Sequence, residues 1–159
     1  MKNLNEIYAY SEQSKTCLIR IDGKVAGSLD SSKYYRVSRL GKKLLCHRVI
    51  YELFNGPIPD GLQIDHINGI KTDNRIENLR LATPSQNQQN QEINSRNTTG
   101  VRGLDWNKGA WRGKIRCGGV RHHFHSQDRT EVEQWLIKTR QELHGEFSFD
   151  AAMQQGGQP

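Results

Sequence analysis

Hydrophobic and polar residues alternate in short runs along the first part of the chain. The alternation has period two over residues 17–21 and 34–40, which is typical of short β-strands. Residues 44–46 are expected to form the return strand of a hairpin that turns at Gly41-Lys42. From His47 to Asn55 the apolar residues recur at helical spacing, so a short helix is predicted there.

The next segment predicts two strands joined by a polar loop. Leu62–His66 has the length and alternation of a short strand, with Leu62, Ile64 and His66 on one face. A polar loop from Asn68 to Asn74 carries the chain back, and Asn78–Ala82 alternates as the second strand.

A helix follows, and its first residues carry the chemistry of a helix start. Thr83 can cap the helix, Pro84 suits the first helical position, and Gln86 completes a capping box. From Gln86 to Asn97, eight of twelve positions are Asn or Gln, a composition that is also typical of disordered segments. We expect helix over the first half of this tract and an interdomain linker over residues 93–99.

The carboxy-terminal part predicts a small sheet and one helix. Residues 100–125 alternate as three short strands, with turns at 107–109 and 118–119. Thr130–His144 is amphipathic and is expected to be a helix that covers one face of this sheet. The tail over residues 148–159 is expected to be disordered.

The predicted fold class is therefore α+β, in two small modules. Hydrophobic residues make up only 34% of the 159 positions, which is lean for one large core and favours small modules joined by a polar connector. The expected organisation is a first domain over residues 1–92, a linker over 93–99, a second domain over 100–147 and a tail over 148–159.

Positive charge is concentrated in one short stretch. The chain carries a formal net charge of +6, and between Arg96 and Arg121 there are seven Lys or Arg residues and a single acid, Asp105. A focused basic segment suits a polyanionic partner such as nucleic acid. A basic composition alone would be weak evidence, because many soluble proteins are basic without binding one.

The cysteines and the apolar segments indicate in which cellular compartment the protein is expected. Cys17, Cys46 and Cys117 are scattered and form no CxxC pair, so neither a disulfide framework nor a structural zinc site is expected. The apolar runs are too short for a membrane span, and the amino terminus lacks a signal-peptide core. We expect a soluble cytoplasmic protein, in a bacterial or phage-infected cell, with no membrane partner.

Asp65 and His66 are the candidates for chemistry on a phosphodiester bond. Such hydrolysis needs a base that deprotonates water and a cation that neutralises the phosphate. Neighbours on a strand point to opposite faces, so one residue can hold a metal while the other faces the attacking water, provided that the backbone bends at the strand end. Asn87, one turn into the following helix, can add an amide oxygen. Carboxylate and amide oxygens suit Mg²⁺ or Mn²⁺ rather than zinc.

The polar residues around this pair recur at fixed offsets. They are Asp65-His66-Ile67-Asn68-Gly69, then Asp73-Asn74-Arg75-Ile76-Glu77-Asn78-Leu79-Arg80, then Thr83 and Asn87. Over about residues 34–94 this string resembles the HNH endonuclease family, of the homing type found in phages and introns. The resemblance implies a ββα-metal module with His66 as general base, oriented by Asn78 through its other ring nitrogen. It also implies Asp65 as a metal ligand and Asn87 as the residue that completes the metal site.

Three further polar residues have more than one interpretation. His47-Arg48 also recurs in the HNH family, but a structural histidine at a helix start is the more frequent case. Asn74 could be a metal ligand, a DNA contact or a turn former, and the turn interpretation is favoured.

The basic stretch arranges its cations on one face of the predicted sheet. Arg112, Lys114 and Arg116 alternate with Trp111, Gly113 and Ile115, so the two sets face opposite sides. Arg102 with Trp106 on the preceding strand, and Arg121 with His123 on the next, are expected to add to the cationic face. A merely solvated charged face is the alternative. The DNA-binding candidates are Arg102, Trp106, Arg112, Lys114, Arg116, Arg121 and His123.

The same segment resembles a known DNA-binding domain. Gly100-Val101-Arg102-Gly103-Leu104-Asp105-Trp106, Trp111-Arg112-Gly113-Lys114-Ile115-Arg116 and the helix ending Leu143-His144-Gly145-Glu146-Phe147 are similar to the Apetala-type domain. The resemblance implies a three-stranded antiparallel sheet that enters the major groove, with one helix behind it.

Two function classes follow from the sequence. The first is a metal-dependent DNA endonuclease that uses Mg²⁺ or Mn²⁺, acts on double-stranded DNA and is a monomer or weak dimer. The second is a sequence-specific DNA-binding or regulatory protein whose nuclease module is inactive. The joint presence of Asp65, His66, Asn78 and Asn87 favours the first.

Overall fold

The computed structural model describes residues 3–90 and 96–147 and divides into two compact units, Met1–Gln88 and Gln89–Pro159. Residues 93–95 of the expected linker and the expected tail over 148–159 lie outside the described residues. Among the described residues, none of the helices combines the length and the apolar character that a membrane crossing requires.

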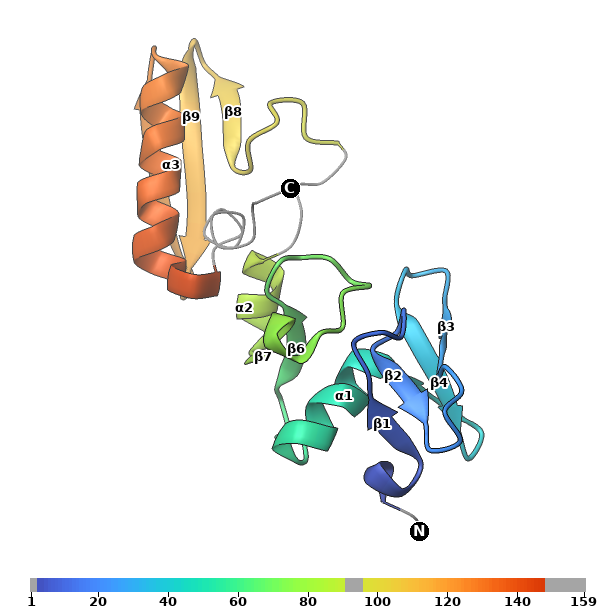
Figure 1. The fold of residues 1–159 in the computed structure, drawn as a ribbon. Helices are drawn as coiled ribbons and strands as arrows, with labels where there is room; N and C mark the ends of the chain where they lie inside the picture. Colours follow the sequence, from blue (N-terminus) through green and yellow to red (C-terminus); the bar gives the residue numbers. More distant parts are fainter. Residues whose placement is uncertain (1–2, 91–95, 148–159) are drawn as a thin grey trace. The chain divides into compact units, whose positions relative to one another are not determined.

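The first unit combines small antiparallel sheets with two α-helices (Figure 1). β1 pairs with β2, β4 lies between β3 and β5, and β6 pairs with β7. The elements are η1 (Leu4–Glu6), β1 (Tyr8–Tyr10), β2 (Leu18–Arg20), β3 (Ser28–Leu29), β4 (Tyr35–Arg39), β5 (Lys42–Leu45), α1 (Cys46–Asn55), β6 (Gln63–His66), η2 (Ile76–Asn78), β7 (Leu79–Ala82) and α2 (Pro84–Gln89). The strands and the helix predicted in this part are confirmed to within about two residues.

The core of the first unit lies between α1 and the strands around it. α1 contacts β1, β4, β5 and β6 (Figure 1). Val49 and Ile50 on α1 are buried, together with Leu18 on β2, Val37 on β4 and Ile64 on β6. Burial of these apolar side chains is the main driving force for the fold, and it fixes β6 against α1.

Tight turns set the register of the hairpins. Arg39 pairs with Lys42, so the turn between β4 and β5 is Leu40-Gly41, one residue earlier than predicted. Both turn residues have positive φ, 49° and 75°, as the two-residue hairpin turn that matches the twist of the strands requires. Gly41 adopts this conformation without steric cost, which explains its place in the turn.

The start of α2 confirms the predicted capping box. The backbone amide of Gln86 donates to the Thr83 hydroxyl at 3.3 Å, and the Gln86 side-chain oxygen accepts from the Thr83 amide at 2.8 Å. These bonds satisfy amides that have no partner within the helix. The capping box therefore fixes where α2 leaves β7, and with it the position of Asn87.

The second unit is a three-stranded antiparallel sheet covered by one helix. β9 (Ala110–Cys117) lies between β8 (Leu104–Asn107) and β10 (Val120–Ser126). α3 (Arg129–His144) lies along β9 and ends in η3 (Gly145–Phe147) (Figure 1). The predicted three strands and the helix of this unit are confirmed, except that the first strand begins at Leu104 and not near residue 100.

The packing of α3 explains the glycine in the middle of β9. A Cβ atom on Gly113 would lie 2.9 Å from a ring carbon of Trp135 and 3.0 Å from a methyl group of Val132. Val132 and Leu136 on α3 are fully buried against Leu104 and other apolar residues of the sheet. This close approach leaves the opposite face of the sheet to the solvent.

We expect Leu136→Ala to lower the free energy of unfolding of the second unit by about 2–5 kcal/mol, because the change leaves a cavity in a small core. Ile137→Ala, at an exposed position on the same helix, is the control and should change it by no more than about 0.5 kcal/mol. Tryptophan fluorescence during urea unfolding reports on this unit, which contains all three tryptophans. Equal effects of the two variants would contradict this assignment of the core.

The end of the expected linker is bonded into the second unit. The Asn97 side chain donates to the Val101 carbonyl at 3.0 Å and accepts from the Gly100 amide at 2.8 Å. The Thr99 hydroxyl lies within hydrogen-bond distance of the carbonyls of Val101 and Leu104, at 2.9 and 3.2 Å. Short polar side chains thus bond local backbone groups at Asn97 and Thr99, and the boundary of the linker at residue 99 stays a prediction.

Candidate active site

Asp65 and His66 point to opposite faces of β6, as predicted. In the β6–β7 hairpin, Asp65 pairs with Arg80 and His66 pairs with Leu79. Ile64 and His66 therefore share the face that meets α1, whereas Gln63 and Asp65 share the other face. Both Asp65 and His66 are only 5% exposed.

Arg80 compensates the charge of the buried Asp65 carboxylate. The Arg80 guanidinium donates from Nε to Asp65 Oδ2 at 2.9 Å, and its Nη2 lies 2.9 Å from the same oxygen. A buried carboxylate requires such a partner, because desolvation of an unpaired charge is costly. The sequence offered a signal for this pair, since directly opposed residues of a hairpin interact, but Arg80 was not singled out.

Asn87 lies on the face of the hairpin that carries Asp65. Its side-chain amide donates to the Gln63 side-chain oxygen at 2.7 Å, and Gln63 precedes Asp65 by two residues on the same face of β6. The predicted metal-ligand candidates, Asp65 and Asn87, thus come from β6 and α2 to one side of the hairpin.

The donor atoms on this side suit a hard divalent cation. No group of three His, Cys, Asp or Glu side chains that could hold a metal occurs within residues 3–90 and 96–147. Asp65 and Asn87 supply a carboxylate and an amide oxygen, and Mg²⁺ commonly binds to one or two carboxylates while it keeps several waters. The residues present therefore fit Mg²⁺ or Mn²⁺.

The His66 ring is packed among aromatic rings on the other face. It lies 4.9 Å from the His47 ring, edge to face, and 6.2 Å from the Tyr34 ring, between ring centroids. Burial lowers the pKa of His66, although Asn74 and the charges of Asp65 and Asp73 oppose this effect. A lowered pKa keeps the ring unprotonated at neutral pH, which is the state a general base requires.

His47 is a buried helix-start residue that also touches the site. It is the second residue of α1, and burial lowers its pKa to about 3, with further contributions from the charges of His66, Arg48 and Arg36. Arg48 is half-buried beside it. His47 is thus a neutral ring that packs against His66. The positive charge of Arg48 helps to keep His47 neutral.

Asn74 is neither exposed nor part of a turn. It is 1% exposed, its side-chain oxygen lies 3.1 Å from His66 Nε2, and its side-chain nitrogen donates to the Thr16 backbone carbonyl at 3.2 Å. The favoured turn interpretation is therefore wrong, because burial and two specific hydrogen bonds tie this residue to His66.

Asn78 organises the loop between β6 and η2 and does not bond the His66 ring. Its side-chain nitrogen donates to the Asn68 side-chain oxygen at 3.0 Å and to the Asp73 carbonyl at 2.7 Å. Its side-chain oxygen accepts a hydrogen bond from the backbone N–H of Asn68 at 3.0 Å. The prediction that Asn78 orients His66 directly is therefore wrong, because the side-chain amide of Asn78 bonds the loop backbone and the Asn68 side chain instead.

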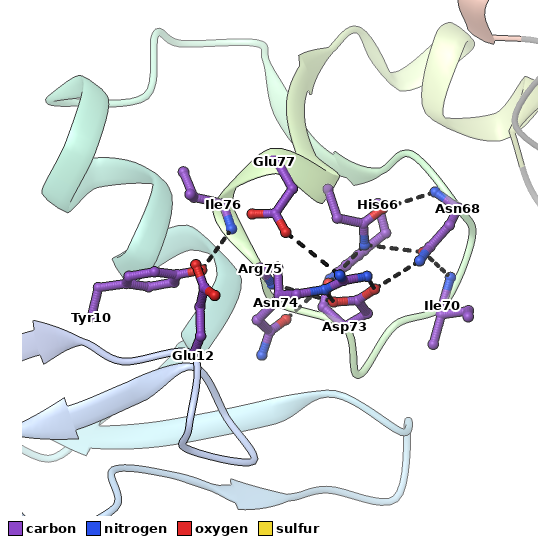
Figure 2. Close-up of polar contacts among 11 residues, drawn as sticks. Tyr10, Glu12, His66, Asn68, Ile70, Asp73, Asn74, Arg75, Ile76 and Glu77 are labelled. Atoms are coloured by element: carbon purple, nitrogen blue, oxygen red, sulfur yellow. Dashed lines mark hydrogen bonds and ion pairs between the residues drawn. The ribbon is translucent and has the colours of Figure 1, made fainter. Parts of the chain in front are cut away.

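The same loop is braced by a second set of bonds, shown in Figure 2. The Asn68 side chain donates to the Asp73 carboxylate at 2.8 Å, and the Arg75 guanidinium donates to both oxygens of that carboxylate at 2.7 and 2.8 Å. The bonds from Arg75 and Asn68 lower the pKa of Asp73. The backbone amide of Ile76 also donates to the Tyr10 hydroxyl of β1 at 3.3 Å.

Tyr34 and Lys71 stand beside the histidines and were not predicted. The Lys71 ammonium lies 5.0 Å from the centre of the Tyr34 ring, in cation–π geometry. Burial raises the pKa of Tyr34, and the charges of Asp65 and Asp30 raise it further. No sequence spacing signals this contact, because Tyr34 precedes β4 and meets the site only in the folded chain.

The exposed face of the second sheet carries the predicted cations. Lys114, Arg116, Arg121 and His123 are exposed there, while Gly113 and Ile115 are buried against α3. Arg112 shares this face, because it pairs with Asp105 and His125 across the strands. The alternation predicted for β9 and β10 is confirmed.

Asp105 holds two of these cations in place. Its carboxylate accepts from Arg112 Nε and Nη2, both at 2.9 Å, and from the Lys114 ammonium at 2.5 Å. The pKa of Asp105 is lowered to about 2, and the hydrogen bonds from Arg112 make the largest contribution.

Two of the DNA-binding candidates lie elsewhere. Trp106 pairs with Trp111 in the register of β8 and β9, so it points to the α3 side, where the two rings meet edge to face at 5.2 Å. Arg102 lies in the turn before β8 rather than on a strand beside Trp106. Their predicted place on the cationic face is wrong, because the strand begins only at Leu104 and its register places Trp106, which stays 55% exposed, on the face opposite to the cations.

Comparisons of the sequence with known proteins identify relatives of this chain. The family model described as HNH endonuclease matches residues 44–89, which contain α1, the β6–β7 hairpin and α2. Protein 3.8 of Escherichia phage T7 is 44% identical over 104 residues, which cover 64% of this chain and 86% of that protein. An uncharacterized HNH endonuclease of Acanthamoeba polyphaga mimivirus is 35% identical over 116 residues, covering 72% of this chain and 60% of that protein.

No solved structure gives a significant match. Because the chain is 44% identical to Protein 3.8 of phage T7 and covers 86% of it, the two belong to the same family, and residues 44–89 of the chain form an HNH endonuclease domain.

Proposed function

We propose that this protein is a metal-dependent DNA endonuclease that hydrolyses phosphodiester bonds of double-stranded DNA. The observation that carries the proposal is the end of the β6–β7 hairpin, where His66 and Asp65 are adjacent and Asn87 bonds Gln63 on the Asp65 side. The HNH domain supports a nuclease of this kind. Asp65 and Asn87 would hold Mg²⁺ or Mn²⁺, which supplies charge neutralisation at the phosphate and at the leaving oxygen.

His66 supplies the base in this proposal. Its burial among His47 and Tyr34 keeps the ring neutral, so a ring nitrogen can accept the proton of the attacking water. Asp65 contributes its carboxylate as a metal ligand, and the Arg80 guanidinium balances the negative charge of that carboxylate. Asn78 acts at a distance, by shaping the loop that runs from the end of β6 to η2.

The second unit is the DNA-docking module of the proposal. A three-stranded sheet with an exposed cationic face and one helix behind it is the architecture that the Apetala-type resemblance implies. Arg112, Lys114, Arg116, Arg121 and His123 would meet the DNA, and the face is narrower than expected because Trp106 and Arg102 lie outside it. One copy of the chain carries one such catalytic centre, so a monomer would cut one strand at a time.

The alternative is a DNA-binding or regulatory protein whose nuclease module is inactive. Metal-free DNA binding and Mg²⁺-dependent cleavage, measured on the same preparation, separate the two. The endonuclease both binds and cuts, whereas the regulatory protein binds with equal affinity and leaves the DNA intact. Binding without cleavage in both Mg²⁺ and Mn²⁺ would refute the proposed function.

We expect Arg112→Ala and Arg116→Ala to weaken DNA binding, and each lost phosphate contact should reduce the slope of log K against log salt by about one. The physical reason is that each arginine releases counterions from the DNA when it binds. Lys138→Ala removes the same charge from the exposed side of α3 and serves as the control, with no change in slope expected. A folded protein whose affinity and slope survive both arginine substitutions would exclude this face from the interface.

A further inference from the structure

Asn74 connects the β1–β2 loop to the proposed catalytic base. The residue is buried in the first unit, and its side-chain amide forms one bond at each end. Asn74 Nδ2 donates to the Thr16 carbonyl at 3.2 Å, and Oδ1 faces His66 Nε2 at 3.1 Å (Figure 2 shows Asn74 and His66). Thr16 lies 58 residues earlier in the chain and outside the segment matched by the HNH family model.

The Thr16 carbonyl fixes the direction of the Asn74 amide. A carbonyl oxygen accepts but cannot donate, so only the Nδ2 end of the amide can face Thr16. The Oδ1 end must then face His66, and an amide oxygen is likewise an acceptor only. In the neutral ring, Nε2 must therefore carry the hydrogen, and the lone pair belongs to Nδ1.

Thr16 is itself held rigidly. It is fully buried, its hydroxyl donates to the Leu18 carbonyl at 2.9 Å, and the Leu18 amide donates back to that hydroxyl at 3.2 Å. The Ser14 hydroxyl lies 3.1 Å from the Thr16 hydroxyl, which adds a further bond within the loop. The carbonyl of Thr16 is thus a fixed reference point for Asn74.

We propose that Asn74 is a positioning residue that transfers the fixed direction of the Thr16 carbonyl to His66, and so holds the neutral ring with hydrogen on Nε2. Nδ1 is then the atom that takes the proton from the attacking water. This inference rests on the proposed function, in which His66 is the base. It assigns to Asn74 the orienting role that the family resemblance implied for Asn78, and it makes the β1–β2 loop part of the catalytic machinery.

A purely packing role for Asn74 predicts something different. A residue that only fills space can be replaced by an apolar side chain of similar size without affecting the tautomer of His66. A residue that orients the ring cannot, because an incorrect tautomer removes the lone pair from the reacting position and can cost up to about 10⁴-fold in kcat.

The test is the tautomer of His66 in the full-length protein, read from long-range proton–nitrogen NMR correlations of ¹⁵N-labelled protein at a pH where the ring is neutral. The His66 signals are assigned by their loss in His66→Gln. We expect Nε2 to be protonated in the unmodified protein. A ring protonated on Nδ1, or an equal mixture of tautomers, overturns the inference even if the protein cleaves DNA.

Two substitutions extend the test. Asn74→Leu keeps most of the side-chain volume, and we expect mixed tautomers and a kcat at least about tenfold lower, with KM little changed. Ile70→Ala changes an exposed side chain of the same loop without touching the ring, and it should leave the Nε2–H tautomer in place. Should Asn74→Leu not fold, the spectrum of the unmodified protein still decides.

The outcomes separate this inference from the proposed function. Cleavage that requires His66, together with an unchanged tautomer and kcat in Asn74→Leu, overturns the positioning role and leaves the nuclease assignment intact. An unmodified protein that binds DNA without cutting it refutes the nuclease assignment, while the tautomer in the spectrum still reports whether Asn74 orients the ring.

Discussion

Replacement of His66 is expected to reduce DNA cleavage by about 10²–10⁴-fold, because one imidazole supplies the proton transfer of the rate-limiting chemistry. His66→Ala removes the ring, and His66→Gln keeps much of the bulk and the polar character but cannot accept a proton at neutral pH. The measurement is the single-turnover cleavage rate at saturating protein. DNA affinity should remain near that of the unmodified protein, because the cationic face that we propose for docking belongs to the second unit.

The control for this prediction is the folded state of the variants. His66 packs against His47 and Tyr34, so a melting curve must accompany each rate. A variant that is folded and still cuts at the unmodified rate would remove His66 from the role of base. Loss of cleavage in His66→Gln, with binding retained, would separate catalysis from docking.

The second large effect is expected at Asp65. Asp65→Ala should eliminate turnover, because it deletes a proposed metal ligand, and it should also destabilise the first unit by about 3–5 kcal/mol. The physical reason for the destabilisation is Arg80, whose side chain is only 13% exposed and would lose the partner of its charge. Urea unfolding, followed through the tyrosine ring signals, reports on this unit, which contains all five tyrosines.

A double variant separates the two effects of Asp65. Asp65→Leu combined with Arg80→Met replaces the buried pair by apolar side chains, which is often neutral or stabilising. We expect this variant to regain most of the lost stability and to remain inactive. If the double variant cuts DNA, Asp65 is not a metal ligand, and if Asp65→Ala alone is as stable as the unmodified protein, the ion pair contributes nothing.

The elements that the sequence predicted are those with a strong local signal. The capping box at Thr83, the helical spacing of Val49 and Ile50, and the period-two alternation around Trp111 each depend on neighbours in the chain. The strands β1 and β3 have no such signal. Tyr8–Tyr10 and Ser28–Leu29 become strands because β2 and β4 offer partners, and pairing between distant segments is not encoded in a short window.

The candidate site shows the same division. The opposite directions of Asp65 and His66 follow from the geometry of any strand, and the sequence sufficed to predict them. The partner of His66 did not follow, since Asn74 and Asn78 lie only four residues apart and the spacing of each from His66 allows a contact. Only the folded structure, in which Thr16 faces Asn74, distinguishes them.

The most direct test of the central claim is incubation of the purified protein with supercoiled plasmid, with and without EDTA. Nicked circular DNA is expected to accumulate in Mg²⁺, because one chain carries one His66–Asp65 centre, and no product is expected when the metal is removed. A plasmid that stays supercoiled in Mg²⁺ and in Mn²⁺ while the protein binds it, or cleavage that persists after exhaustive chelation, would contradict the account.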